Sequence, residues 1–273
     1  MAYRNLYALV LGSSSGFGKE TCIELAKQGY NIFGVHFDLG SARARVEAQK
    51  NFLEELGVKV KFFNVNAADD KKRAEVIAGI KEHFANEENP VLRVLLHSLA
   101  FGAIKPFFDE DFENMVTKKQ VEMTMDVMAN SLIYWTQDLF KEKLLAENSR
   151  IFALTSIGST RAMANYGSIS AAKAAIEAYI RQIAIELAPY KITANSIQAG
   201  LTDTPAARKI PGFHKSLEHA KEHNPFRRNT VPGDVAKAIS LLVDEKLYWI
   251  TGDTIKVDGG ESILNFIEDD SEH

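Results

Sequence analysis

The chain has 273 residues, of which 46% are hydrophobic and 25% charged, and its formal net charge is -4. This balance is typical of a globular enzyme and excludes a disordered chain, while the absence of a basic patch argues against a nucleic-acid partner. No apolar run reaches the roughly 18 residues of a membrane span, and the single cysteine, Cys22, excludes an internal disulfide and favours a reducing, cytoplasmic location.

Apolar runs of strand length alternate with helix-length amphipathic segments along the whole chain. This alternation predicts one α/β domain over residues 1–273, a doubly wound parallel sheet with helices on both faces. Ligands of such sheets bind beyond the carboxyl ends of the strands. The expected strands are 7–11, 31–37, 59–65, 91–97, 150–155, 191–198 and 254–257, and the clearest expected helices are 19–28, 42–56 and 71–84.

A glycine-rich loop, "LGSSSGFG", joins the first expected strand to the first expected helix. Gly12, Gly16 and Gly18 fall in the pattern G-x-x-x-G-x-G. Glycines at this place let the backbone turn tightly and approach a pyrophosphate, whose charge then lies at the helix N-terminus. The loop therefore predicts a nucleotide cofactor, although three glycines alone also fit a plain strand–helix turn.

Asp38 comes about twenty residues after the loop, near the end of the second expected strand. A carboxylate there can accept both ribose hydroxyls of NADH and would repel the 2′-phosphate of NADPH. Ser15 stands in the glycine loop, where a basic residue would help to hold that phosphate, but His36 and Arg43 are nearby. The cofactor is thus NADH or NADPH, with a lean to NADH, unless Asp38 only caps a loop.

The segment "YGSISAAK" places Tyr166 and Lys173 seven residues apart. Seven helical residues turn through about 700°, nearly two full turns, so both side chains would share one helix face. We expect Ser168 to cap the helix, which would leave Tyr166 just outside it while Lys173 projects from within. The alternative is an ordinary helix pair without chemistry.

These motifs together resemble the short-chain dehydrogenase/reductase family. The resemblance covers about residues 5–262 and rests on the glycine loop, "HSLA" (97–100), Ser156, Tyr166, Lys173, "AGLTDT" (199–204) and "DGG" (258–260). It implies a single Rossmann-like domain, nicotinamide-dependent hydride transfer and a homotetramer. It also implies cofactor contacts by further residues: Ser14, Phe17, Asn66, Ser98, Ala100, Gly200 and Thr204.

Within that family the chain is similar to the enoyl-acyl-carrier-protein reductases of bacterial fatty-acid synthesis. Most family members have tyrosine four residues before the lysine, where this chain has Ile169, whereas enoyl reductases have the longer gap seen here. Met128 stands where the family usually has an asparagine, and Asn130 is out of register by two. The resemblance implies that hydride reaches C3 of an enoyl thioester carried on acyl carrier protein, while Tyr166 stabilises the enolate oxygen and Lys173 holds the cofactor ribose.

Ser156 keeps a second function open. It lies seventeen residues before Lys173, the offset of the family's catalytic serine in carbonyl reductases. The alternative is therefore a 3-oxoacyl reductase or another short-chain alcohol dehydrogenase. A nucleotide-sensing protein without activity is a third possibility, because a fold does not fix a function.

Residues 205–230 interrupt the strand–helix order, and we expect them to form a mobile lid over the substrate. His219 and His223 within this segment form an i, i+4 pair, the spacing of two metal ligands on one helix face. Because no third ligand or H-E-x-x-H motif accompanies them, we expect a solvated helix and no metal site. We expect the acidic tail, residues 268–273, to fray.

Overall fold

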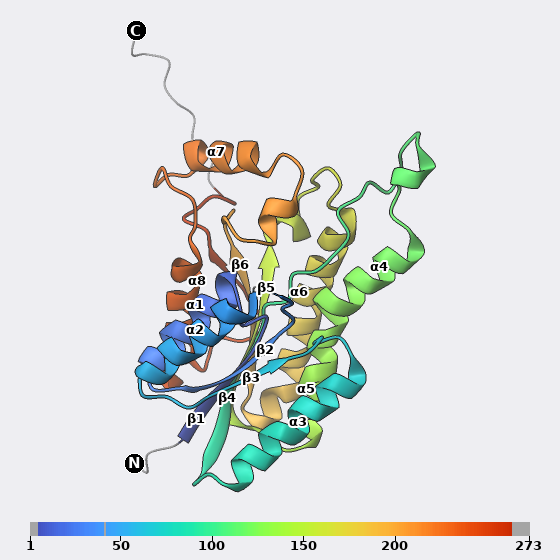
Figure 1. Ribbon diagram of the computed structural model, residues 1–273. Helices are drawn as coiled ribbons and strands as arrows, with labels where there is room; N and C mark the ends of the chain where they lie inside the picture. The colour runs from blue at the N-terminus through green and yellow to red at the C-terminus, as the bar shows by residue number, and fades with distance from the viewer. Residues whose placement is uncertain (1–4, 41, 264–273) are drawn as a thin grey trace.

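The computed structural model describes residues 5–40 and 42–263, which form one parallel sheet with helices on both faces (Figure 1). Seven strands lie in the order β3-β2-β1-β4-β5-β6-β7, and every neighbouring pair runs parallel. The predicted fold class is confirmed. The strands are β1 (Asn5–Leu11), β2 (Asn31–His36), β3 (Val60–Asn64), β4 (Pro90–His97), β5 (Leu145–Ser156), β6 (Thr193–Ala199) and β7 (Thr254–Val257).

The helices cover the sheet in two groups. Helices α1, α2 and α8 lie on one side and α3, α4, α5 and α6 on the other, as Figure 1 shows. Their bounds are α1 (Gly16–Lys27), α2 (Ala42–Glu55), α3 (Asp70–Ala85), α4 (Lys118–Met125), α5 (Ser131–Lys141), α6 (Gly167–Leu187), α7 (Phe213–His223) and α8 (Pro232–Leu242).

Strand β1 shows why the sheet needs both groups of helices. Successive side chains of a strand point to opposite faces. Ala8 and Val10 are buried with residues of α1 and α8, whereas Leu9 and Leu11 are buried with residues of α3, α5 and α6. A strand that is buried on both faces, such as β1, reads as a nearly continuous apolar run, and such runs indicated most of the strands.

Strand β5 is longer than the sequence indicates. It begins at Leu145 rather than near residue 150, and its first part is only partly buried. Asn148 has a left-handed φ of 68°, and the pairing with β4 shifts register between Leu92 and Val94. This irregular stretch lacks the continuous apolar pattern that marks the rest of the strand.

The strand order reverses between β1 and β4, and this reversal opens the crevice in which such sheets bind ligands. The amide of Ser98, just after β4, donates to the carbonyl of Leu11 at the end of β1, at 2.9 Å. The amide of Gly12 donates to Val35 of β2 at 2.8 Å. The loops after β1, β2 and β4 therefore meet at one edge of the sheet.

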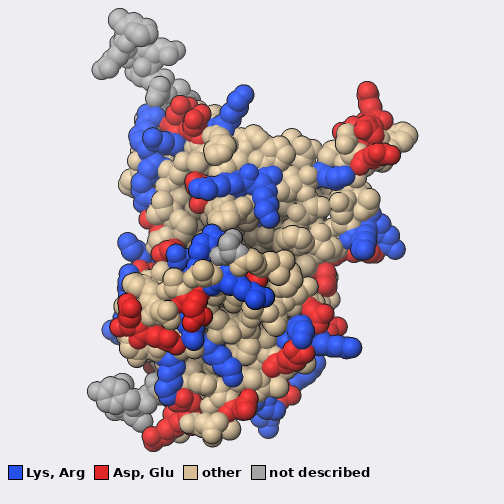
Figure 2. All heavy atoms as spheres, viewed as in Figure 1, with Lys and Arg blue, Asp and Glu red and all other residues tan. Residues whose placement is uncertain are grey.

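Helix α7 lies beyond the carboxyl edge of the sheet, at the top of Figure 1. Only Phe213 and Ala220 of this helix are buried, so it rests on the body through one narrow stripe. Figure 2 shows basic and acidic side chains intermixed on one face, with acidic ones gathered on the projecting segment that holds the 3-10 turn Phe112–Asn114. None of the helices in the described ranges has the length and apolar character that a membrane span needs.

Candidate active site

The glycine loop packs against the loops that follow β4 and β6. A Cβ atom at Gly12 would lie 2.4 Å from the carbonyl oxygen of Ser98, and one at Gly18 would lie 2.1 Å from the carbonyl oxygen of Gly12. Gly16 has a φ of 52° and faces the methyl group of Thr204, which a Cβ would approach to 3.4 Å. The backbone can make these approaches only because the side chains are missing.

The N-terminus of α1 is free to receive an anion. Its N-cap residue, Ser15, makes no side-chain cap hydrogen bond, and the first turn holds no acidic residue. The first backbone N–H groups of a helix carry partial positive charge and need acceptors from outside the helix. Together with the space left by the three glycines, this cradle fits the pyrophosphate of a nicotinamide dinucleotide.

Asp38 is held in place by two neighbouring strands. Its carboxylate Oδ2 lies 3.0 Å from Nδ1 of His36. Its backbone N–H donates to Oδ1 of Asn64 at 3.0 Å, and the Asn64 amide donates back to the Asp38 carbonyl at 2.9 Å. The sequence predicted a carboxylate at the end of β2 but not this pairing with His36.

The structure tests two expectations about the start of α6: that Tyr166 stands outside the helix and that Ser168 caps it. Tyr166 is the N-cap residue and stands just before the first helical residue, Gly167, so the expected exit of the tyrosine from the helix is confirmed. The expected cap by Ser168 is wrong, because Ser168 lies inside α6 and its buried Oγ has no hydrogen-bond partner among the described residues. The helix therefore begins two residues earlier than a Ser168 cap would require.

Burial sets the protonation of this pair. Burial raises the pKa of the Tyr166 phenol, and the nearby Ser156 offsets part of that rise. Lys173 is fully enclosed, and its Nζ donates to the carbonyl oxygen of Leu154 at 2.7 Å. Burial lowers the pKa of Lys173 to about 8, and the charge of Glu177 opposes the shift. Tyr166 thus keeps its proton at neutral pH, where it can donate a hydrogen bond.

Several buried polar atoms near Tyr166 have no partner among the described residues. Besides Ser168 these include Oγ of Ser156, at the end of β5, and Oγ of Ser159. Buried polar atoms normally find partners, so an edge with several orphaned hydroxyls fits a site that a polar ligand completes. Gly158 lies between them, and the Tyr166 ring would be only 2.7 Å from a Cβ there.

The loop after β6 closes the crevice on its other side. Gly200 allows close packing, because a Cβ there would lie 2.3 Å from Oγ1 of Thr230. The carboxylate of Glu261 accepts from the amide of Leu201 at 3.0 Å. Thr204, which faces Gly16, is buried and accepts from the amide of Ala207 at 3.2 Å.

The other predicted cofactor residues occupy the loops at this edge. Ser14 and Phe17 belong to the glycine loop and the first turn of α1, and both are partly buried. Ala100 lies after β4 and is exposed, as is Asn66 after β3. The side chain of Asn66 accepts from the amide of Ala68 at 3.0 Å, so its oxygen serves the local turn.

The comparison with protein families decides between the enoyl and carbonyl alternatives. Residues 12–262 match the sequence model of a family described as enoyl-(acyl carrier protein) reductase. The chain belongs to this family. The match favours the enoyl-reductase prediction, and it makes the chain a nicotinamide-dependent oxidoreductase of the short-chain dehydrogenase/reductase type, as the motifs predicted.

Known relatives agree with this membership. The chain is 33% identical over 201 residues, 74% of each chain, to an NADH-dependent enoyl-acyl-carrier-protein reductase of Neisseria meningitidis. It is 28% identical over 228 residues to an NADPH-dependent one of Staphylococcus aureus, with 82% of this chain and 84% of that protein covered. The crystal structure of an NADH-dependent enoyl reductase from Aquifex aeolicus shares the fold, with a TM-score of 0.83 at 22% identity over 97% of this chain and 99% of that one.

A buried histidine of the reductase escaped the sequence analysis. His97, the last residue of β4, has its Nε2 2.8 Å from Oγ of Ser131, while its Nδ1 is buried without a partner among the described residues. Burial lowers the pKa of His97 to about 3, and the charge of Lys173 adds to the shift. The segment "HSLA" marked His97 as part of a motif, but nothing in the sequence indicated its partner 34 residues away.

A turn of π-helix, Asp126–Asn130, explains where the family's usual asparagine has gone. Met128, at the expected place of that asparagine, is buried and faces Gly102, whose Cβ would lie 2.9 Å from its sulfur. Asn130 instead accepts a hydrogen bond from the Tyr179 hydroxyl at 2.9 Å. The asparagine that the sequence placed out of register therefore serves the packing of α6 rather than the crevice.

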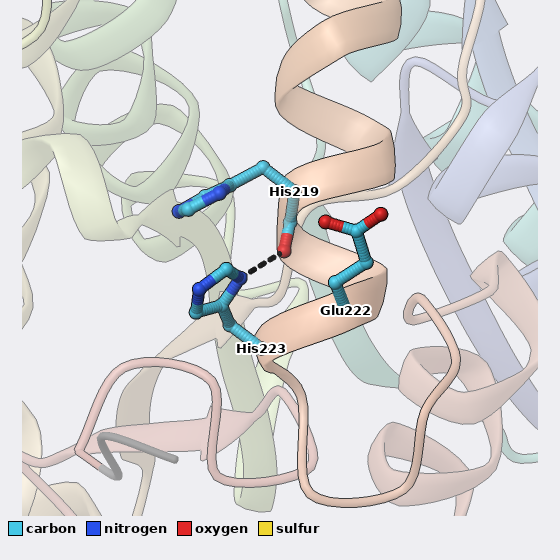
Figure 3. A group of neighbouring side chains, drawn as sticks. All are labelled: His219, Glu222 and His223. Atoms are coloured by element: carbon cyan, nitrogen blue, oxygen red, sulfur yellow. Dashed lines mark hydrogen bonds between the residues drawn. The ribbon is translucent and has the colours of Figure 1, made fainter. Parts of the chain in front are cut away.

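Helix α7 of the reductase holds a third candidate ligand that the sequence analysis missed. Glu222 lies between His219 and His223 in the sequence, and the ligand atoms of all three lie within 4.8 Å of one another (Figure 3). Residues 219–223 form the motif H-x-x-E-H, in which the glutamate follows the first histidine by three residues and not by one as in H-E-x-x-H. The expectation that no third ligand accompanies the two histidines is therefore wrong.

Proposed function

We propose that the reductase reduces the C2–C3 double bond of an enoyl thioester and that Tyr166 is the donor to the thioester oxygen. The observation that carries the proposal is the position of Tyr166 at the N-cap of α6, while Lys173 is enclosed two turns further on. In an enoyl thioester the hydride reaches C3 but the negative charge collects on the oxygen beyond C2. A phenol that stands outside the helix suits an acceptor in which these two atoms are separated.

Tyr166 acts on charge that appears only during the reaction. The phenol keeps its proton because burial raises its pKa, and it donates a hydrogen bond to the enolate oxygen as that oxygen becomes negative. One such donor commonly lowers the barrier by about 3 kcal/mol. Ser156, whose Oγ is buried without a partner among the described residues, is a second donor to the same region.

Lys173 binds rather than reacts. Among the described residues its enclosed ammonium has one acceptor, the Leu154 carbonyl, so further donor capacity remains for the ribose hydroxyls of a cofactor. A bound nicotinamide supplies the hydride. The cradle at Gly12, Gly16 and the α1 N-terminus would hold its pyrophosphate, and Thr204 would meet its carboxamide.

The cofactor is NADH in this proposal. Asp38 is fixed by His36 and Asn64, and a carboxylate held there disfavours a 2′-phosphate. The feature that favours NADPH instead is a cavity of about 370 Å³ lined by His36 and Arg43 together with other residues. A direct comparison of Kd for the two cofactors tests this choice, and a tenfold preference for NADPH would mean that Arg43 and His36 hold the phosphate.

Residues 205–230 form the lid of the proposed site. They contain the 3-10 turn Ala207–Lys209 and α7, which lie between the loop with Thr204 and the start of α8. The substrate is carried on acyl carrier protein, and the active form is a cytoplasmic homotetramer, in keeping with the family's enzymes and with a single buried cysteine. These assignments rest on family membership.

The decisive experiment compares two substrates on one carrier. We expect kcat/KM for crotonyl thioester to exceed that for acetoacetyl thioester by at least about tenfold, or about 1.4 kcal/mol in the barrier. Both are measured with the same cofactor, first as coenzyme A and then as carrier-protein thioesters. Equal values, or a preference for the ketone, would overturn the enoyl assignment and return the role of Ser156 to carbonyl chemistry.

A further inference from the structure

The last turns of α7 bring together three side chains with metal-binding atoms. His219, Glu222 and His223 occupy positions i, i+3 and i+4, which are neighbours on a helix surface. The imidazole ring centroids lie 3.9 Å apart with the planes 35° from parallel. Figure 3 shows both rings on the same side of the helix, with the carboxylate of Glu222 across the His219 carbonyl from them.

The hydrogen bond of His223 determines which of its nitrogens can bind a metal. Its Nδ1 lies 2.8 Å from the carbonyl oxygen of His219. A carbonyl oxygen only accepts, so Nδ1 carries the proton, and in the neutral ring Nε2 then presents its lone pair. Histidines that bind metals usually donate their other ring N–H in this way, which fixes the tautomer and the ring orientation.

The backbone under the cluster is anchored on both sides. Ala220 is buried against the body, and Asn224, the residue after the helix, is 2% exposed. The Asn224 amide donates to the Asp258 carbonyl at 3.0 Å, and the Arg227 guanidinium donates to the carbonyl of Glu222 at 2.5 Å. The three side chains are exposed, but the turn that carries them is held in place.

We propose that His219, Glu222 and His223 form a site for a divalent transition metal, with Zn²⁺ as the reference ion, and that the bound metal stabilises the C-terminal turn of α7. Two imidazole nitrogens and one carboxylate oxygen are a common zinc donor set. Ca²⁺ and Mg²⁺ prefer all-oxygen sites, so the two histidines select against them. No other group of three such ligands is found in the ranges 5–40 and 42–263.

Three ligands leave at least one coordination position to water. The exposed site therefore binds more weakly than a closed four-ligand structural site. Its effect on α7 is direct, because a metal held by residues 219 and 223 links two successive turns. Any consequence for turnover rests on the proposed lid role of 205–230, whereas metal binding itself does not.

The first test is a zinc titration of the full chain, cleared of metal with a chelator, followed by calorimetry without substrate or cofactor. We expect one tight equivalent of Zn²⁺ and no binding of Mg²⁺ under the same conditions. His219→Ala and His223→Ala should each weaken zinc binding by at least about tenfold, and Glu222→Gln by a similar factor or somewhat less. His214→Ala is the matched control, because His214 is exposed on the same helix but outside the cluster. Zinc affinity that is unchanged in His219→Ala, or lost equally in His214→Ala, would overturn the site.

The second test measures amide hydrogen exchange across α7 with and without zinc. We expect slower exchange around residues 219–224 in the wild type on addition of zinc and no change in His223→Ala. Zinc binding without this protection would overturn the stabilising role. Because neither test uses a thioester, a failure of the enoyl-reductase assay would leave both results standing.

Discussion

Helix α6 begins at the carboxyl edge of the sheet and α7 lies beyond it, yet the two are fixed by opposite means. Helix α6 buries a full stripe that includes Ile169, Ile176 and Ile180 against the strands, and its Lys173 is itself buried. Helix α7 buries only Phe213 and Ala220 and keeps its histidines in solvent. The first helix is part of the core, whereas the second rests on its surface.

This difference corresponds to two kinds of chemical task. A donor such as Tyr166 must be held within a fraction of an ångström, which requires a rigid packed element. A lid or an adaptable metal site needs an element that can open at low cost, with few buried apolar contacts. The enclosed helix also shifts the pKa values of its groups, because burial penalises charge.

The largest expected effect is a loss of stability in acid that depends on the buried His97 and not on the exposed His219. The pKa of His97 is about 3 in the folded chain and about 6.5 when unfolded. Between these values the unfolded state binds more protons, so stability falls as the pH drops from 6.5 towards 3, by up to about 5 kcal/mol. The measurement is the free energy of urea unfolding of wild type and of His97→Gln at several pH values.

In His97→Gln most of this loss should disappear. His219→Gln, the exposed counterpart, should retain the wild-type dependence. An identical pH dependence in wild type and His97→Gln would mean that the fold does not lower the pKa of His97.

The second effect tests whether α6 positions the donor. Tyr166→Phe should lower kcat roughly 150-fold, equivalent to about 3 kcal/mol in the barrier, because the phenol acts on charge formed in the transition state. Cofactor Kd, measured by fluorescence, should stay nearly constant. A correctly folded Tyr166→Phe protein with wild-type kcat would remove Tyr166 from the reaction.

The third effect concerns Lys173, which we expect to lower the unfolding free energy while it binds the cofactor. The pKa of Lys173 is about 8 in the fold and about 10.5 in the unfolded chain, so holding this ammonium protonated costs about 3 kcal/mol at pH 7. Lys173→Met removes that cost and loses one charge-assisted hydrogen bond, to Leu154, worth about 2 kcal/mol. We expect unfolding free energy to rise by about 1 kcal/mol while cofactor binding and turnover collapse.

The pH dependence of that gain has a fixed sign. As the pH rises from 8 to 10.5 the wild-type lysine is already neutral in the fold while the unfolded chain still binds the proton, so wild-type stability increases. The advantage of Lys173→Met should therefore shrink over this range. A variant less stable than wild type at pH 7 would show that the hydrogen bond outweighs the burial of charge.

The smallest effect compares packing directly. Leu217→Ala, on the half-buried flank of α7, should lower unfolding free energy by about 1 kcal/mol, since only part of a leucine is removed from water there. Ile176→Ala, fully buried in α6, should cost about 3 kcal/mol because it also leaves a cavity. Equal losses in urea unfolding would mean that α7 is as firmly packed as α6.

Much of the site was predictable because its signals are local. The glycine loop lies between a strand and a helix that the apolar pattern already indicates, and the Tyr166–Lys173 spacing is read within eight residues. The prediction of a Ser168 cap was wrong because helix starts depend on packing: Gly167 lies against the Phe107 ring, which a Cβ there would approach to 2.6 Å.

The predicted acidic tail, residues 268–273, lies outside the described residues.

The sequence by itself determined the seven parallel strands, their helices and the loops proposed to hold the cofactor, because apolar periodicity and glycine placement act over short distances along the chain. Only the tertiary structure decided the partners of the individual polar groups: His97 with Ser131, Asp38 with His36 and Asn64, and Lys173 with Leu154. These contacts depend on which faces pack together and on how far each strand reaches. The same packing sets the pKa values of His97 and Lys173, since burial is a property of the fold and not of any short stretch of residues.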